Sequence, residues 1–267
     1  MHHFLASSAL LAAALFARPA AAEMKAEPLE WTVGQDRFSG WLVYDEQGDE
    51  RRPGLVMVPN WMGVSEDALE RARAIAGDDY VVLVADVYGK GRRPKDSAEA
   101  GKLAGSLRGE DRSALRARMQ AAVDTLKAQA GSAPLDADRV GALGFCFGGS
   151  AALELARSGA DVAGVVSLHG GLAPGAESAT AERIRAPVLV LNGADDKAVS
   201  DADIKAFEDE MDAAGADWQF VDFSGAVHCF AEPSAGGDPA SNCRYDERAA
   251  KRAYRMMDAF FGEVFAD

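Results

Sequence analysis

The sequence predicts an α/β protein: a mostly parallel central sheet of about eight strands, with helices on both faces. Short, near-continuous apolar runs such as PGLVMVP (residues 53–59) and DYVVLVAD (79–86) are typical of strands buried on both faces. Segments with apolar residues at helical spacing separate such runs, as in residues 111–130. The chain has 267 residues, of which 48% are hydrophobic, so it can bury one large core. We therefore expect a single domain over residues 23–267.

The expected elements alternate along the chain. Two antiparallel strands at 29–34 and 38–45 come first, followed by the strand at 53–59. Ser65 or Asp67 can cap the next helix, which we expect to end at Gly77. After the strand at 79–86 and the helix at 111–130, the predicted strands are 139–145, 161–170, 186–193 and 217–225, and the predicted helices are 147–158, 201–214 and 250–265.

Residues 1–22 have the pattern of a cleaved signal peptide. The apolar run FLASSALLAAALFA is too short to span a bilayer, and Ala20 and Ala22 form an A-x-A cleavage signal before Glu23. The alternative is a hydrophobic N-terminal helix of the mature fold. No later segment approaches the ~18 apolar residues of a membrane helix. We expect an exported soluble protein, periplasmic if the organism has two membranes.

The charge argues against one class of binding partner, and the cysteine content predicts a disulfide. The formal net charge of −14 argues against a nucleic-acid binder, which needs a basic face. The chain has three cysteines, so at least one thiol stays free. Export permits disulfides, and Cys229 and Cys243 flank a Gly/Pro/Ser-rich loop at 234–242. We predict a disulfide between them; the alternative is two unrelated buried thiols.

The stretch GFCFG fits a strand–turn–helix elbow that presents a nucleophile. Gly144 and Gly148 permit a strained turn, and Cys146 projects from it at the carboxyl end of the sheet. The following helix points its N-terminus at the thiol, which favours a thiolate. The Phe147 N–H can donate to an oxyanion. The alternative is that Cys146 is a small buried hydrophobic residue beside packing glycines.

Two further residues complete a catalytic set. Asp196 follows one buried strand in the context G-x-x-D-x-x-V, and His228 follows the last strand. Cys146, Asp196 and His228 thus occur in the order nucleophile, acid, histidine, each at the carboxyl end of a strand. The histidine can remove the thiol proton, and the carboxylate can orient the imidazole. Asp195 is the alternative acid, but the spacing favours its neighbour.

These motifs carry a family resemblance. From about Trp31 onward, the segments VPNWMGV, VADVYGKG, GFCFGG, NGADDKAV and GAVHCF resemble the dienelactone hydrolase family, which has the α/β-hydrolase fold. The resemblance implies hydrolysis of enol-lactones and related esters through an acyl-cysteine intermediate, without metal or cofactor. The implied partner is a small-molecule ester or lactone.

The resemblance also implies residues around the nucleophile. The Trp61 backbone N–H would be a second oxyanion donor, and Trp61 and Met62 would line the pocket; ordinary packing at the sheet edge is the alternative for both. Tyr88 and His169 follow sheet strands and are expected to face the site. A purely structural role for His169 is equally compatible with the sequence.

Two positions depart from the family pattern. Asn60 stands where the family has a glutamate that holds the resting thiol neutral, and an amide cannot accept a proton at neutral pH. We therefore expect a resting thiolate–imidazolium pair between Cys146 and His228. Glu232 stands where the family has an arginine that binds a substrate carboxylate, which argues against an anionic dienelactone as substrate.

Two other classes of function remain open at this point. An exposed reactive thiol in an oxidising compartment suits a redox protein, although the chain lacks a C-x-x-C motif. A binding domain that keeps the fold without catalysis is the second alternative. Turnover of an ester substrate by the wild type and by Cys146→Ala separates these classes.

Overall fold

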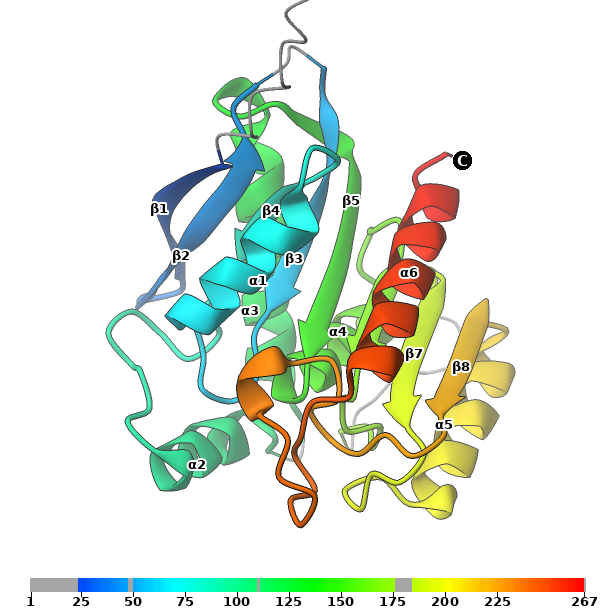
Figure 1. Cartoon of the computed structure of the whole chain (residues 1–267). Coiled ribbons are helices and arrows are strands. Elements are labelled where there is room, and N and C mark those ends of the chain that lie inside the picture. Colours follow the sequence, from blue (N-terminus) through cyan, green and yellow to red (C-terminus); the bar gives the residue numbers. More distant parts are fainter. Residues whose placement is uncertain (1–23, 48–49, 110, 176–183, 267) are drawn as a thin grey trace, which may run out of the picture.

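The centre of the molecule is an eight-stranded sheet, seen in a computed structural model that describes residues 24–47, 50–109, 111–175 and 184–266 (Figure 1). The strand order is β1-β2-β4-β3-β5-β6-β7-β8. The pairs β1–β2 and β2–β4 are antiparallel, and all other pairs are parallel. The strands are β1 (Met24–Val33), β2 (Asp36–Asp45), β3 (Arg52–Val58), β4 (Val81–Val84), β5 (Leu135–Phe145), β6 (Val165–Leu168), β7 (Val188–Gly193) and β8 (Trp218–Phe223).

This architecture confirms the predicted mostly parallel sheet. The predicted signal peptide, residues 1–22, lies outside the described residues. The long apolar runs became central strands because both of their faces are covered. In β3, for example, Leu55 and Met57 pack into one core cluster, whereas Val56 and Val58 pack into the other.

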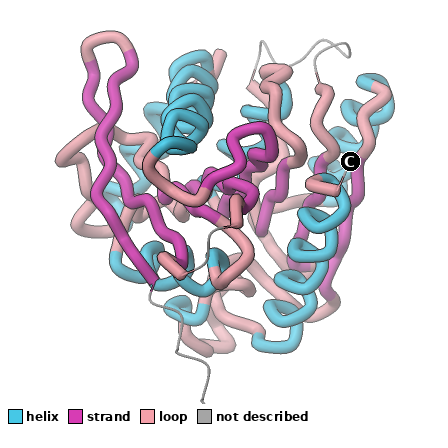
Figure 2. The backbone as a smooth tube through the Cα atoms, turned by 90° about the horizontal axis from the view of Figure 1, so that it is seen from above, coloured by secondary structure: helices cyan, strands magenta, loops and turns pink. Residues whose placement is uncertain are grey.

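Helices form a layer on each face of the sheet (Figure 2). α1 (Glu66–Ala76) and α6 (Glu247–Val264) cover one face, and α3 (Ser113–Lys127), α4 (Phe147–Arg157) and α5 (Asp201–Ala214) cover the other. Ser65 caps α1 by accepting from the Ala68 N–H, which decides between the two predicted caps, and Gly77 ends the helix at φ 44°. Within the described ranges, none of these helices is long and apolar enough to cross a membrane.

One helix has no counterpart among the predicted elements. α2 (Ser97–Leu107) begins at Asp96, whose side chain accepts from the N–H groups of Ala98 and Glu99. It lies at the carboxyl ends of the parallel strands (Figure 1). The helix contains two glycines and buries mainly small side chains, so its apolar periodicity is weak. The helix predicted at 111–130 is α3 as far as Lys127 and then tightens into a 3₁₀ turn, Ala128–Gly131. A second 3₁₀ turn, Pro233–Ala235, was not predicted.

The predicted disulfide is present. Cys229 and Cys243 are bonded, with their Cα atoms 4.9 Å apart and 14 positions between them in sequence, and Cys146 is free. The bond fixes the segment that follows β8 against the segment that precedes α6. Next to it, the Arg244 N–H donates to the His228 carbonyl at 3.1 Å. The disulfide therefore lies directly beside the histidine of the predicted catalytic set.

Removing this disulfide is expected to destabilise the protein. In the chain-entropy model, a loop of this length contributes about 3 kcal/mol to the free energy of unfolding. The double variant Cys229→Ala/Cys243→Ala should lose about that amount in chemical denaturation, and mild reduction of the wild type should give the same loss. Thiol titration of the denatured, unreduced wild type should find one free thiol; three would contradict the bond.

Candidate active site

The nucleophile elbow has the strained geometry that the sequence predicts. Cys146 joins β5 to α4 with φ 53° and ψ −115°, a backbone conformation that is rare for a residue other than glycine. A Cβ at Gly144 would lie 2.0 Å from the Gly148 carbonyl oxygen. A Cβ at Gly148 would lie 2.0 Å from the Val58 carbonyl oxygen. Both glycines are therefore required so that α4 can pack this closely on β3 and β5.

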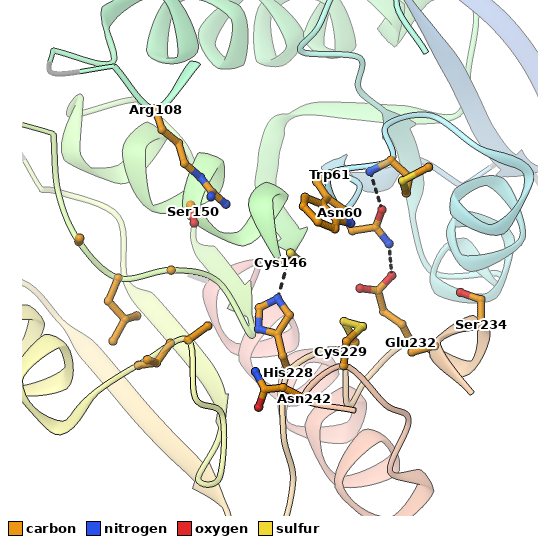
Figure 3. A pocket seen from close by; sticks show the side chains of 18 of the residues that line it. Asn60, Trp61, Arg108, Cys146, Ser150, His228, Cys229, Glu232, Ser234 and Asn242 are labelled. Atoms are coloured by element: carbon orange, nitrogen blue, oxygen red, sulfur yellow. Dashed lines mark hydrogen bonds between the residues drawn. A yellow bond between two sulfur atoms is a disulfide. The ribbon is translucent and has the colours of Figure 1, made fainter. Parts of the chain in front are cut away.

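The three predicted catalytic side chains meet at the carboxyl ends of their strands. The Cys146 Sγ lies 3.0 Å from Nε2 of His228 (Figure 3). Nδ1 of the same ring lies 2.6 Å from Oδ2 of Asp196. Asp196 is buried, whereas the alternative acid, Asp195, is exposed. The geometry thus selects Asp196 over its neighbour.

The electrostatics of this set favour a charged imidazole. Burial opposes the charge on His228, but its hydrogen bonds to Asp196 and Cys146 outweigh this cost and raise the pKa of His228 to about 10. Burial also opposes the charge on Asp196 and so raises the pKa of its carboxyl. The hydrogen bond and charge of His228 outweigh burial, and the pKa of Asp196 is lowered overall. Both shifts favour an ionised Asp196 beside a protonated His228 at neutral pH.

Sequence reasoning missed a third partner of the acid. Asn242 donates from Nδ2 to Oδ1 of Asp196 at 3.0 Å, and its own Oδ1 accepts from the Lys197 N–H at 3.1 Å. The Ala198 N–H also donates to Asp196 Oδ1, at 2.8 Å. Asn242 precedes Cys243, so the disulfide holds it near the carboxylate. The only signal for Asn242 in the sequence is its place at the end of the 234–242 loop, directly before Cys243 of the predicted disulfide.

The two predicted oxyanion donors lie on the expected elements. Phe147 is the first residue of α4, so its N–H is one of those that no helical carbonyl accepts. Trp61 lies in a tight turn closed by a hydrogen bond from the Gly63 N–H to the Asn60 carbonyl at 2.9 Å. Among the described residues, the Trp61 N–H has no protein acceptor. It is thus free to bind a ligand oxygen.

A cleft of about 800 Å³ opens over the thiol. Its walls come from the turn after β3, from the end of α2, and from the disulfide-bonded loop (Figure 3). The predicted pocket residues Asn60, Trp61 and Met62 line it. Further lining residues that sequence reasoning did not single out are Arg108, Arg112, Ser150, Leu172, Val199, Ser234 and Asn242.

Two predicted pocket residues lie behind the cleft instead. Tyr88 is buried, with its ring stacked on Phe147 at 5.5 Å and its hydroxyl donating to the Trp61 carbonyl at 2.8 Å. His169 is fully buried, and its Nδ1 accepts from the Cys146 N–H at 3.1 Å. Tyr88 was expected to face the site and instead turns inward, where it supports an oxyanion-hole residue. For His169 the structure favours the structural role that the sequence left open, because its ring contacts the backbone of the elbow.

The cleft contains an arginine, although not at the position where the family pattern has one. Arg108 follows α2, and its guanidinium lies 5.3 Å from the centre of the Phe147 ring. It points into the cleft on the side of Ser150 (Figure 3). Sequence analysis overlooked it because α2 itself was not predicted. Glu232, by contrast, is buried beside Asn60 at the edge of the cleft.

The sheet topology and the elbow define an α/β-hydrolase fold, and the residue at the elbow is Cys146. The family model described as "Dienelactone hydrolase family" matches residues 38–265. The chain belongs to the dienelactone hydrolase family. It is accordingly a hydrolase of carboxylic ester or lactone bonds, as the sequence predicts.

Known proteins resemble the chain at several levels of similarity. The crystal structure of a dienelactone hydrolase-like promiscuous phosphotriesterase from metagenomic libraries is 37% identical, with a TM-score of 0.82, covering 91% of this chain and 99% of the other. An uncharacterised protein of Caenorhabditis elegans is 36% identical over 155 residues, which are 57% of this chain and 95% of that protein. A dienelactone hydrolase from Anabaena variabilis, at 21% identity and a TM-score of 0.62, covers 90% and 98% and shares the fold.

Proposed function

We propose that the protein hydrolyses small esters, lactones or thioesters with Cys146 as nucleophile, through an acyl-cysteine intermediate. One observation carries the proposal: a single imidazole, that of His228, lies 3.0 Å from the thiol sulfur and 2.6 Å from a buried carboxylate. This is the arrangement that activates a nucleophile and stabilises the imidazolium.

The chemistry follows from the order of the contacts. The Cys146 sulfur attacks the carbonyl carbon, and the carbonyl oxygen becomes an oxyanion that the N–H groups of Trp61 and Phe147 bind. The imidazolium of His228 then protonates the leaving alcohol or thiol as the acyl-cysteine forms. A water molecule, deprotonated by His228, attacks the thioester carbonyl. Collapse of the second oxyanion releases the acid and restores the thiolate.

Turnover of p-nitrophenyl and thioester substrates tests this function. The wild type should show a burst of p-nitrophenol, and rapid quenching followed by intact-mass spectrometry should find one acyl group, located on Cys146. A redox protein would instead consume a thiol or disulfide reagent without hydrolysing the ester. A binding domain would show neither reaction. Ester turnover without any acyl-protein would argue against the covalent intermediate.

Phosphotriesters are a second candidate substrate class. The support is the relative named as a promiscuous phosphotriesterase, which is 37% identical with a TM-score of 0.82. The same sulfur would attack phosphorus and expel one ester oxygen as p-nitrophenolate, while the phosphoryl oxygen binds the same two N–H groups. Water deprotonated by His228 would then cleave the sulfur–phosphorus bond and release the phosphodiester. A neutral p-nitrophenyl phosphotriester assayed beside the carboxylic esters tests this, and no release above that of Cys146→Ala would reject it.

The resting state of the thiol is open to a direct test. Since the pKa of His228 is raised to about 10, the imidazolium should persist across neutral pH and stabilise a thiolate on Cys146. Iodoacetamide should therefore alkylate Cys146 at pH 6 faster than it alkylates free cysteine. A rate that rises only near pH ~8.5, as for an unperturbed thiol, would contradict the ion pair.

Export is also part of the proposal. The A-x-A signal at Ala20 and Ala22 and the disulfide between Cys229 and Cys243 both suit an oxidising compartment. The mature protein is expected outside the cytoplasm, in the periplasm if the organism has two membranes, with Glu23 at its N-terminus. N-terminal sequencing of fractionated protein checks this, and recovery of the unprocessed chain from the cytoplasm would argue against it.

A further inference from the structure

A buried carboxylate lies at the edge of the cleft, outside the catalytic set. Glu232 is 1% exposed, and its Oε2 accepts from Arg71 Nη2 at 2.9 Å. Arg71, on α1, is itself 8% exposed and lies over the Phe145 ring at 4.5 Å. A carboxylate withdrawn this far from water needs such a partner. The proposed reaction steps leave this ion pair without a role.

The carboxylate faces the turn that carries an oxyanion donor. Glu232 Oε2 also accepts from Nδ2 of Asn60 at 2.5 Å, and Oδ1 of the same amide accepts from the Met62 N–H at 3.0 Å (Figure 3). A carboxylate can only accept, so it forces the amide to present its NH₂ group. The amide oxygen is thereby left for Met62. The Asn60 amide thus links Glu232 to the turn around Trp61.

The second carboxylate oxygen lies toward the nucleophile elbow. Glu232 Oε1 lies 3.7 Å from Nε2 of His169. Burial, together with the charges of His228 and Arg71, holds the pKa of His169 well below its usual value, so the ring is neutral. The Cys146 N–H is shared between Nδ1 of His169, at 3.1 Å, and the Leu168 carbonyl, at 3.0 Å. Nε2, on the other side of the ring, faces the carboxylate without a hydrogen bond. Glu232 thus lies between the supports of the two oxyanion donors.

We propose that Glu232, with its charge balanced by Arg71, is a positioning residue for the oxyanion hole: it orients the Asn60 amide and so holds the 60–63 turn that presents the Trp61 N–H. The inference rests on the proposed function for its kinetic consequence. It also gives Asn60 a role of its own. The sequence identified Asn60 only as the position where the family's glutamate is absent. The carboxylate of Glu232 is present nearby, but Arg71 balances its charge and its Oε2 accepts from the Asn60 amide.

Changing either of the two hydrogen-bonding groups tests the inference. Asn60→Asp sets two carboxylates against each other, and Glu232→Gln removes the charge that forces the amide orientation. Each single variant should lower kcat for a p-nitrophenyl ester about 10- to 100-fold, as expected for a misplaced oxyanion donor, with KM changed less than about 3-fold.

Two further measurements separate positioning from general damage. Alkylation of Cys146 by iodoacetamide needs no oxyanion hole, so Glu232→Gln should keep its rate within about 3-fold. Glu210→Gln is the matched control, because Glu210 also pairs with a buried arginine, Arg157, at 2.7 Å, away from the cleft. Its kcat should equal that of the wild type.

Hydrogen exchange gives a readout that does not depend on turnover. The Met62 and Gly63 amides should exchange at least ~10-fold faster in either variant than in the wild type. Wild-type kcat and unchanged exchange in Glu232→Gln would overturn the inference. If the wild type shows no ester turnover, the proposed function fails, and the exchange result alone decides the structural role of Glu232.

Discussion

Replacing Cys146 with alanine is expected to abolish ester hydrolysis, with kcat reduced by about 10⁴-fold or more. Without the sulfur there is no acyl-enzyme, and two of the influences that raise the pKa of His228, its hydrogen bond and its charge interaction with Cys146, are lost. The oxyanion donors alone would leave a small residual rate. Steady-state assays with a p-nitrophenyl ester measure the effect. A wild-type rate in this variant would reject Cys146 as nucleophile.

The stability of that variant is an internal control. Alanine keeps the Cβ that the elbow already accommodates at φ 53°, so the thermal midpoint should shift by no more than a few degrees. Cys146→Ser should retain weak activity, because the hydroxyl can occupy the elbow but His228 would have to remove a far less acidic proton. A large loss of stability in Cys146→Ala would mean that the rate loss reports unfolding instead.

Replacing Asp196 with asparagine is expected to lower kcat by about 10³- to 10⁴-fold. Asp196 is ionised, and its carboxylate both orients the His228 ring and raises its pKa. With a neutral amide in its place, the imidazolium loses its proton at lower pH. Alkylation of Cys146 at pH 6 should then slow, and its rate should rise with pH. Kinetics and alkylation measured on the same preparation check both consequences.

The neighbouring aspartate provides the matched control. Asp195→Asn makes the same chemical change one residue away, at an exposed side chain. Its kcat and its alkylation profile should match those of the wild type. If Asp195→Asn were instead the impaired variant, the assignment of the acid would pass to Asp195, and the 2.6 Å contact between Asp196 and His228 would have no catalytic meaning.

The amino-acid sequence determined the features that depend on local pattern. Near-continuous apolar runs predicted the buried strands, and the glycines around Cys146 predicted the elbow, because no side chain fits where β3 and α4 approach. The order of Cys146, Asp196 and His228 predicted their meeting, because parallel strands bring their carboxyl ends to one edge. Cysteine spacing and loop composition sufficed to predict the disulfide.

Only the tertiary structure decided the features that depend on contacts between distant segments. α2 escaped prediction because it buries few large apolar side chains, and Arg108 was overlooked with it. Tyr88 and His169 follow strands just as the catalytic residues do, yet pattern alone cannot tell whether such a side chain turns into the cleft or behind it. Glu232 and Asn60 are 172 positions apart in sequence. Their hydrogen bond exists because β3 and the loop after β8 end at the same edge of the sheet, while α1 brings Arg71 to the carboxylate from one face.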